Sequence, residues 1–196
     1  MSRPPNARAS CFTVWCLLAI VVILGVTATV ELGLGRTPTY SHGPVRLWSG
    51  DTHGGQNSQQ LFDPYSLTHV IHGVLFYALT RAVLGAAPVA ARAVAATAIE
   101  ATWELMENTD WVIDRYRSET IALDYHGDSV VNSVSDILSS LCGFLLAWRL
   151  PKRATVAGAL LIEIALAFWI RDNLTLNVIM LVHRVPAIAA WQGAPR

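Results

Sequence analysis

The run FTVWCLLAIVVILGVTATV (residues 12–30) decides the fold, because its nineteen residues carry no charge and reach the length that a helix needs to cross a bilayer. Arg3 and Arg8 precede the run, and Glu31 and Arg36 close it. A cleaved signal peptide has a similar basic flank, but its apolar core is only about 7–15 residues long. The run therefore predicts a retained first membrane helix, with a cleaved signal peptide as the alternative.

The composition of the whole chain agrees with a membrane protein. Apolar residues make up 53% and charged residues 14%, whereas soluble domains have about 25% charged residues. The net charge is zero, so no basic field points to nucleic acid, and the expected partner is the lipid bilayer. The three cysteines, Cys11, Cys16 and Cys142, lie in apolar runs without metal-binding spacing, so neither a disulfide framework nor a cysteine–zinc site is expected.

Further apolar segments follow, separated by polar or proline-containing connections. Together they predict one all-α domain over residues 1–196, a polytopic membrane bundle of about five helices at 12–31, 66–86, 93–108, 128–150 and 154–170. The connection at 33–65 is expected to be a loop or a short capping structure outside the bilayer, and the ionisable residues at 109–127 are expected to form a capping loop. A nine-residue apolar stretch at 174–182 is too short to span, so it predicts an interfacial or re-entrant helix.

The distribution of basic residues predicts the orientation. Five spans place the two ends of the chain on opposite sides of the membrane. The face of the N-terminus then holds seven basic residues, and the other face holds five before the tail: Arg3, Arg8, Arg81, Arg92, Arg149, Lys152 and Arg153 against Arg36, Arg46, Arg115, Arg117 and Arg171. The excess favours a cytoplasmic N-terminus.

Acidic residues form a stripe on the predicted third helix. In IEATWELMEN (99–108), Glu100, Glu104 and Glu107 stand at i, i+4 and i+7, within about 60° of one another around the helix. An acidic side chain at the centre of a lone membrane helix costs about 2.5–3.5 kcal/mol. The stripe must therefore face other polar groups, water or a cation.

The neighbouring helices carry matching polar stripes. His69 and His72 lie near the start of the second helix, and Asp128, Asn132 and Asp136 lie on one side of the fourth. In an up-and-down bundle, the start of the second helix, the end of the third, the start of the fourth and the end of the fifth meet at the same membrane face. The polar groups are thus expected to converge at one depth, joined there by Arg171 and Asp172. With the N-terminus in the cytoplasm, this depth is the outer leaflet.

Imidazole and carboxylate groups together form a ligand set for a divalent metal such as Zn, Mn or Fe. We assign His69, Glu104, Glu107 and Asp128 as candidate metal ligands, and Glu100 or Asp136 as a candidate general base. Further polar-core positions are His72, Asn132, Arg171 and Asp172. Three alternatives remain open: interhelical hydrogen bonds at His72 and Asn132, an interfacial anchor at Arg171 and Asp172, and arginines instead of a metal as the counter-charge.

Several stretches resemble uncharacterised protein family 0314, a family of multi-pass bacterial inner-membrane proteins. They are Asn-Ser-Gln (57–59), SLTHVIHG (66–73), IEATWELMEN (99–108), IDRYR (113–117), DYHGDSVVNSVSD (124–136) and RDNLTLNV (171–178). The resemblance covers about 47–191 and implies a bacterial plasma-membrane location without an established activity. Gln60 stands where the family pattern has histidine, which weakens a ligand role for the first loop.

Three functions fit these features. The first is a metal-dependent enzyme that acts on a lipid or envelope precursor near the periplasmic face. The second is a proton- or cation-coupled transporter that uses Glu100, Glu104 and Asp136 as relay groups. The third is a non-catalytic scaffold or assembly protein whose polar core only fixes how the helices pack.

Overall fold

The structure is a computed structural model that describes residues 5–52, 54–120 and 125–194, with side chains from residue 12 onward. Three groups used in the sequence predictions lie outside these residues: Arg3 and the side chain of Arg8, which were counted for the orientation, and Asp124, which belongs to the loop and to one family motif. All named elements in the described residues are helices, so the all-α prediction is confirmed. They are α1 (Pro5–Gly33), α2 (Ser66–Val83), α3 (Val89–Glu107), α4 (Asp110–Glu119), α5 (Val130–Arg149), α6 (Lys152–Trp169), α7 (Leu174–Val182) and α8 (Pro186–Gln192).

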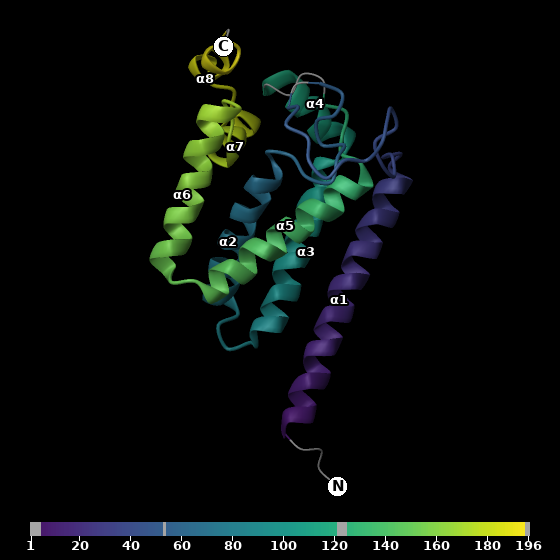
Figure 1. Cartoon of the computed structure of the whole chain (residues 1–196), viewed down its shortest axis with the longest axis vertical. Coiled ribbons are helices and arrows are strands. Elements are labelled where there is room, and N and C mark those ends of the chain that lie inside the picture. The colour runs from purple at the N-terminus through teal and green to yellow at the C-terminus, as the bar shows by residue number, and fades with distance from the viewer. Residues whose placement is uncertain (1–4, 53, 121–124, 195–196) are drawn as a thin grey trace.

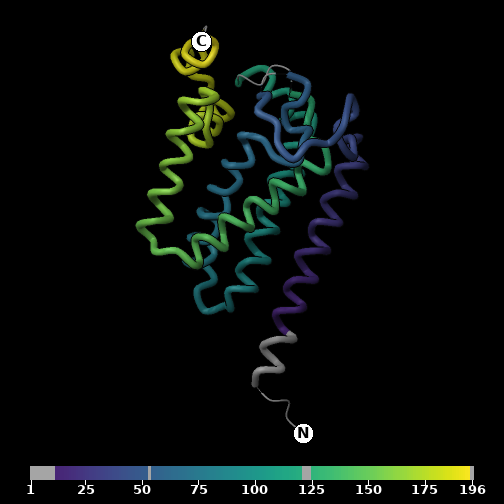
Figure 2. The backbone as a smooth tube through the Cα atoms, in the orientation of Figure 1, coloured from purple at the N-terminus to yellow at the C-terminus, as the bar shows by residue number. Residues whose placement is uncertain are grey.

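The long helices run up and down between two ends of the molecule (Figure 1). The N-terminus of α1 lies at one end, and α7, α8 and the C-terminus lie at the other. The trace in Figure 2 shows that α2 descends from the upper end, α3 returns to it, and α5 crosses the bundle obliquely before α6 returns again. The start of α2, the end of α3 and the start of α5 consequently meet at the upper end, as the topology argument requires.

Helices α1, α3 and α4 differ from the expected ones, and α1 begins at Pro5 instead of residue 12. The third helix begins at Val89 instead of 93, because Pro88 takes the N-cap position with its φ near −55°, a value that suits a helix start. The expected loop at 109–127 contains α4, so this part of the loop prediction was wrong. Val112, Ile113 and Tyr116 form the buried face of α4 and pack with Tyr125 and the partly buried Leu181 of α7.

Within the described residues, two helices are long and apolar enough to cross a membrane: Phe12–Gly33 in α1, and α5. The pair α6 and α7, bent by 70° at its break, would provide a third as a broken span. The bend lies at Arg171, a non-glycine residue with a φ of 58°. Length and composition therefore support a membrane protein.

Two glycines bring α2 and α5 into close contact. A Cβ atom at Gly73 would lie 1.8 Å from the carbonyl oxygen of Ser140, and one at Gly143 would lie 2.0 Å from that of Val70. Neither distance is compatible with a side chain, so both positions require glycine at this separation. Small residues allow membrane helices to approach in this way, and here they bring His69 of α2 toward Asp136 of α5.

The segment between α1 and α2 caps the upper end of the bundle and enters it. Gln60 and Asp63 are fully buried. The carbonyl of Gln60 accepts a hydrogen bond from Asn132 Nδ2 at 2.9 Å. Asp63 Oδ1 accepts from the backbone N–H of Ser66 at 3.2 Å, and Ser66 Oγ accepts from the N–H of Asp63 at 3.1 Å. This reciprocal pair is a capping box that holds the start of α2.

Candidate functional site

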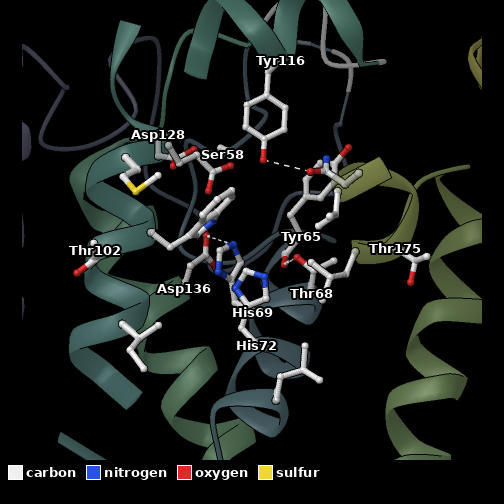
Figure 3. Close-up of a pocket in the computed structure, with 18 of the residues that line it drawn as sticks. Ser58, Tyr65, Thr68, His69, His72, Thr102, Tyr116, Asp128, Asp136 and Thr175 are labelled. Atoms are coloured by element: carbon white, nitrogen blue, oxygen red, sulfur yellow. Dashed lines mark hydrogen bonds and ion pairs between the residues drawn. The ribbon is translucent and has the colours of Figure 1, made fainter. Parts of the chain in front are cut away.

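The two histidines of α2 share one carboxylate of α3. His69 Nδ1 lies 2.5 Å from Glu100 Oε1, and His72 Nδ1 lies 3.0 Å from the same oxygen and 3.2 Å from Oε2. The spacing i, i+3 puts both rings on one side of α2, and their centroids are 5.0 Å apart. Figure 3 shows the two rings side by side, below Tyr116.

Glu104 lies one turn above Glu100 on α3 and is fully buried. Its Oε1 lies 3.2 Å from His69 Nδ1, but the closer Glu100 oxygen occupies the one hydrogen that this nitrogen can carry. Neither oxygen of Glu104 has a hydrogen-bond partner. A buried carboxylate without donors is costly, so Glu104 needs a proton or a cation.

Asp136 approaches the same histidine from α5. Its Oδ2 lies 3.9 Å from His69 Nε2, and its Oδ1 is buried without a hydrogen-bond partner. Asp136 also lines the cavity, so its carboxyl group is available to a bound molecule. Helices α2, α3 and α5 therefore each contribute ionisable groups to one cluster, which we call the His–carboxylate cluster (His69, His72, Glu100, Glu104, Glu107 and Asp136).

Two overlapping groups in this cluster have the spacing of metal ligands. His69, His72 and Glu100 form one group, and His69, Glu104 and Glu107 form the other, with the ligand atoms of each group within 4.8 Å of one another. Tetrahedral bonds of about 2.0–2.1 Å place ligand atoms about 3.3 Å apart. The contacts of His69 with Glu104 and of His72 with Glu100, at 3.2 and 3.0 Å, are close to this value, whereas the contact of His69 with Glu100, at 2.5 Å, is a short hydrogen bond. The structure thus brings together three of the four residues assigned as ligands from the sequence.

Asp128, the fourth assigned ligand, is in neither group. Asn108 Nδ2 and the Tyr125 hydroxyl each donate to its carboxylate at 2.9 Å, and its own N–H donates to Asn108 Oδ1 at 2.8 Å. These bonds fix the end of α3 to the start of α5. Asp128 lines the cavity, but each of its carboxylate oxygens already accepts a hydrogen bond from the protein.

The remaining polar-core residues lie around the cluster. Asn132 holds the capping segment through Gln60. Asp172 accepts hydrogen bonds from the Tyr65 hydroxyl at 3.1 Å and from Gln192 Nε2 at 3.2 Å, which ties α2 to α8. Arg171 Nη1 donates to the carbonyl oxygens of Trp191 and Ala194, so it contacts the C-terminal segment.

A cavity of about 840 Å³ adjoins the His–carboxylate cluster (Figure 3). In this view Tyr116 of α4 lies at the top of the lining, and His69 and His72 lie below it. Its polar lining includes Glu107, Asp128 and Asp136, and its apolar lining comes from α2, α3 and α7. This volume is in the range of small-molecule binding sites.

Two buried acids were missed by sequence reasoning. Glu31 was interpreted as the polar boundary of the first span, yet it is fully buried and neither of its oxygens has a hydrogen-bond partner. Asp63 was expected in a loop outside the bilayer, yet it is fully buried. This burial, together with the charge of Asp128, raises the pKa of Asp63 to about 6. The sequence Asp-Pro-Tyr-Ser (63–66) has the spacing of a capping box, so this signal could have located Asp63.

Fold and site together define a class: an all-helical protein with at least two helices apolar enough to cross a membrane and a buried histidine–carboxylate cluster beside a cavity. Residues 31–194 match the family model described as "Protein of unknown function (DUF2585)". The chain is 47% identical to a UPF0314 protein of Rhizobium johnstonii over 90% of both chains. It is 48% identical to one of Brucella anthropi over 91% of this chain and 92% of the relative, and 44% identical to one of Paracoccus denitrificans over 92% of both.

The chain therefore belongs to this family of unknown function, as the sequence motifs predicted. No solved structure matches it. The matched region starts at Glu31, so it includes every residue of the His–carboxylate cluster and leaves out most of α1.

Proposed function

We propose that this protein is a divalent-metal-dependent membrane enzyme that acts on a lipid or envelope precursor. The observation that carries the proposal is Glu104, a fully buried carboxyl group without a hydrogen-bond partner, 3.2 Å from an imidazole nitrogen. A metal ion would supply the positive charge that Glu104 requires. The nearest imidazole cannot do so alone, because His69 and His72 both make their hydrogen bonds to Glu100.

The proposed ligands are His69, His72, Glu100 and Glu104. Their contacts connect all four in sequence, from His72 to Glu100, from Glu100 to His69 and from His69 to Glu104. Glu107 belongs to the second group of possible ligands and would complete the coordination of a larger ion such as Mn²⁺. This set differs from the sequence-based assignment by including His72 and Glu100 and omitting Asp128.

Asp136 is the proposed general base. A bound divalent ion lowers the pKa of a coordinated water toward neutrality, and a carboxylate within reach of that water can accept its proton. Asp136 meets this requirement because it lines the cavity and has an unpaired oxygen. With a divalent ion held by these ligands, the site would supply an activated water and Asp136 would accept its proton, which makes hydrolysis at an electrophilic carbon the proposed reaction class.

The proposed membrane arrangement has five spans, α1, α2, α3, α5 and α6, with α7 and α8 at the interface. Helices α2 and α3 are more polar than α1, but the ionisable groups along their middle are turned inward: Glu100 and Glu104 are fully buried, and His69 is 6% exposed. Polar residues that face inward are compatible with a span. With the N-terminus in the cytoplasm, the His–carboxylate cluster lies in the periplasmic half of the bacterial inner membrane.

Metal analysis tests the proposal directly. We expect about one equivalent of metal, measured by mass spectrometry of protein purified without chelators, and a loss of at least about tenfold in metal affinity in His69→Ala and Glu104→Gln. Matched controls are His183→Ala and Asp114→Asn, which replace exposed residues and are expected to retain the metal. Wild-type protein that takes up no metal when Zn²⁺, Mn²⁺ or Fe²⁺ is supplied would overturn the enzyme proposal.

The same experiment separates the enzyme from a non-catalytic scaffold. A scaffold needs the cluster only for packing, so Glu104→Gln would lower stability without any metal to lose. A metal-free Glu104→Gln that remains folded, judged by size-exclusion chromatography and helical circular dichroism, supports the enzyme proposal.

A further inference from the structure

We infer that the substrate is an amphiphile whose chain lies between α3 and α7 and whose head group carries no net negative charge. This inference rests on the proposed function, since it takes the His–carboxylate cluster as the place where the head group binds. It adds a substrate class and a route into the site.

The apolar part of the cavity opens sideways. Leu75 of α2, Ile99 and Met106 of α3, and Val178 and Ile179 of α7 all line it, yet these side chains are 37–52% exposed. Figure 3 shows α3 on one side of the cavity and α6 and α7 on the other, with α2 between them. In the proposed five-span arrangement, this mouth faces lipid, so a molecule can enter from the bilayer with its chain against these residues.

The ionisable groups of the cavity are more deeply buried than its apolar groups. His69 and Asp136 are 6% and 4% exposed, whereas Ile99 and Met106 are 37% and 49% exposed. The exposed Thr102 and Thr175 are the hydroxyl groups at the otherwise apolar mouth. An apolar mouth and a polar end match a molecule with one hydrocarbon part and one polar head. A uniformly polar solute would make no apolar contacts with the mouth. A pure hydrocarbon would leave the buried carboxyl groups without hydrogen-bond donors.

The charge of the inner end selects the head group. Glu107, Asp128 and Asp136 line it, and Glu100 and Glu104 lie behind the histidines. Among the residues that the structure describes, none that lines this cavity is lysine or arginine. A phosphate or sulfate head would therefore find no basic side chain in the lining besides the histidines, and it would meet repulsion from each acid that is ionised in this poorly solvated site. A neutral hydroxyl-bearing head or a cationic head meets none.

Brominated amphiphiles provide the test, because bromine quenches nearby tryptophan and Trp103 lines the cavity. The full chain is placed in nanodiscs of uncharged lipid. Three probes with the same brominated chain are compared at equal mole fraction: a monoacylglycerol, an alkyltrimethylammonium and an alkyl phosphate. The signal is the quenching in the wild type minus that in Trp103→Phe. We expect half-maximal quenching by the first two at concentrations at least about tenfold below that of the phosphate.

Two α7 variants test the route. Val178→Phe fills the cavity lining, whereas Val182→Phe, one turn further on and 74% exposed, is not part of that lining. We expect Val178→Phe to weaken Trp103 quenching at least about fivefold and Val182→Phe to leave it unchanged. Equal effects of the two variants would overturn the proposed route, and equal or tighter binding of the alkyl phosphate in the wild type would overturn the charge selection.

Metal content measured on the same samples keeps the two proposals separate. Quenching with the expected head-group order in protein that holds no metal supports amphiphile binding and contradicts the enzyme. Bound metal with no Trp103-dependent quenching by any probe contradicts amphiphile binding and leaves the metal site intact.

Discussion

Buried carboxyl groups dominate the chemistry of this protein at the scale of single residues, and hydrogen bonding divides them into two kinds. Asp63, Asp128 and Asp172 accept several hydrogen bonds each, so their role is to hold the chain together. Glu31 and Glu104 have no hydrogen-bond partner on either oxygen. In a carboxylate of the first kind, the hydrogen bonds of the fold offset the cost of burial. One of the second kind requires a proton or a cation.

Asp63 gives a stability effect with a defined pH dependence. Its pKa in the folded protein is about 6, above the usual value of about 3.9 in an unfolded chain. The folded state then binds more protons between about pH 4 and 6, so this group's contribution to the free energy of unfolding falls as pH rises through that window, by up to about 3 kcal/mol.

We expect the stability of the wild type relative to Asp63→Asn to decrease from pH 4 to pH 7. The measurement is denaturant unfolding in detergent at four pH values. Asp114→Asn, which changes an exposed carboxylate, should show no such trend. A relative stability that increases with pH would contradict the assigned pKa.

The sequence predicted residue types and helix faces better than individual partners. The i, i+4, i+7 spacing placed Glu100, Glu104 and Glu107 on one side of α3, and the described contacts agree. Spacing could not indicate that Glu100 binds both histidines or that Asp128 is already used by Tyr125. Those choices depend on side-chain geometry between helices, which no pattern within one helix contains.

At the scale of helices, two features hold neighbouring helices together: glycines between α2 and α5, and a side-chain cap from α6 at the start of α7. Gly73 and Gly143 allow α2 and α5 to touch through their backbones. At the start of α7, the side chain of Glu163 in α6 accepts hydrogen bonds from the N–H groups of Leu174 and Thr175 at 2.9 and 3.1 Å. A carboxylate at a helix N-terminus is favourable, so Glu163 holds α7 against α6 across the 70° bend.

Substitution of the contact glycines should separate α2 from α5. We expect Gly73→Ala and Gly143→Ala each to lower the free energy of unfolding by at least about 2 kcal/mol, because a methyl group meets a backbone carbonyl. Gly158→Ala in α6 is the matched control, since nothing lies within 4 Å of its Cβ position; it should raise stability by about 0.5–1 kcal/mol. Thermal denaturation in one detergent measures all three, and equal stability of Gly73→Ala and Gly158→Ala would contradict the close crossing.

Removal of the α7 cap should loosen one helix without unfolding the bundle. We expect Glu163→Ala to increase amide hydrogen exchange at Leu174 and Thr175 by about tenfold, equivalent to about 1.4 kcal/mol of local stability. Exchange in α5 should not change. Unaltered exchange at both α7 amides would show that Glu163 does not cap this helix.

For the whole molecule, the sequence predicted the all-helical architecture and the end at which the polar groups gather. It missed α4, because frequent charged residues at 109–127 obscured the apolar face formed by Val112, Ile113 and Tyr116. It also underestimated how deeply the capping segment enters the bundle. Both errors concern short polar segments whose burial depends on elements far away in the chain.

The five-span arrangement can be tested by cysteine labelling in a variant that lacks the native cysteines. Ser41→Cys, Ser118→Cys and Ala86→Cys introduce thiols at exposed positions near the two ends of the bundle. A membrane-impermeant maleimide added to spheroplasts should label positions 41 and 118, and position 86 only after permeabilisation. Labelling of all three from one side would contradict a span by α2, whereas the inverse pattern would contradict only the orientation.

The inward polar faces of α2 and α3 have a consequence for how the chain is made. In a five-span arrangement, α3 alone would carry Arg92, Glu100, Glu104 and Glu107 into lipid, at about 2.5–3.5 kcal/mol for each charge near the centre. Helix α1 can leave the insertion machinery as soon as it is synthesised, because it is apolar on all sides. Helices α2 and α3 are therefore expected to stay beside the translocon, out of contact with lipid, until α5 is synthesised with Asp136 and Asn132. The three helices would then enter the membrane as one unit.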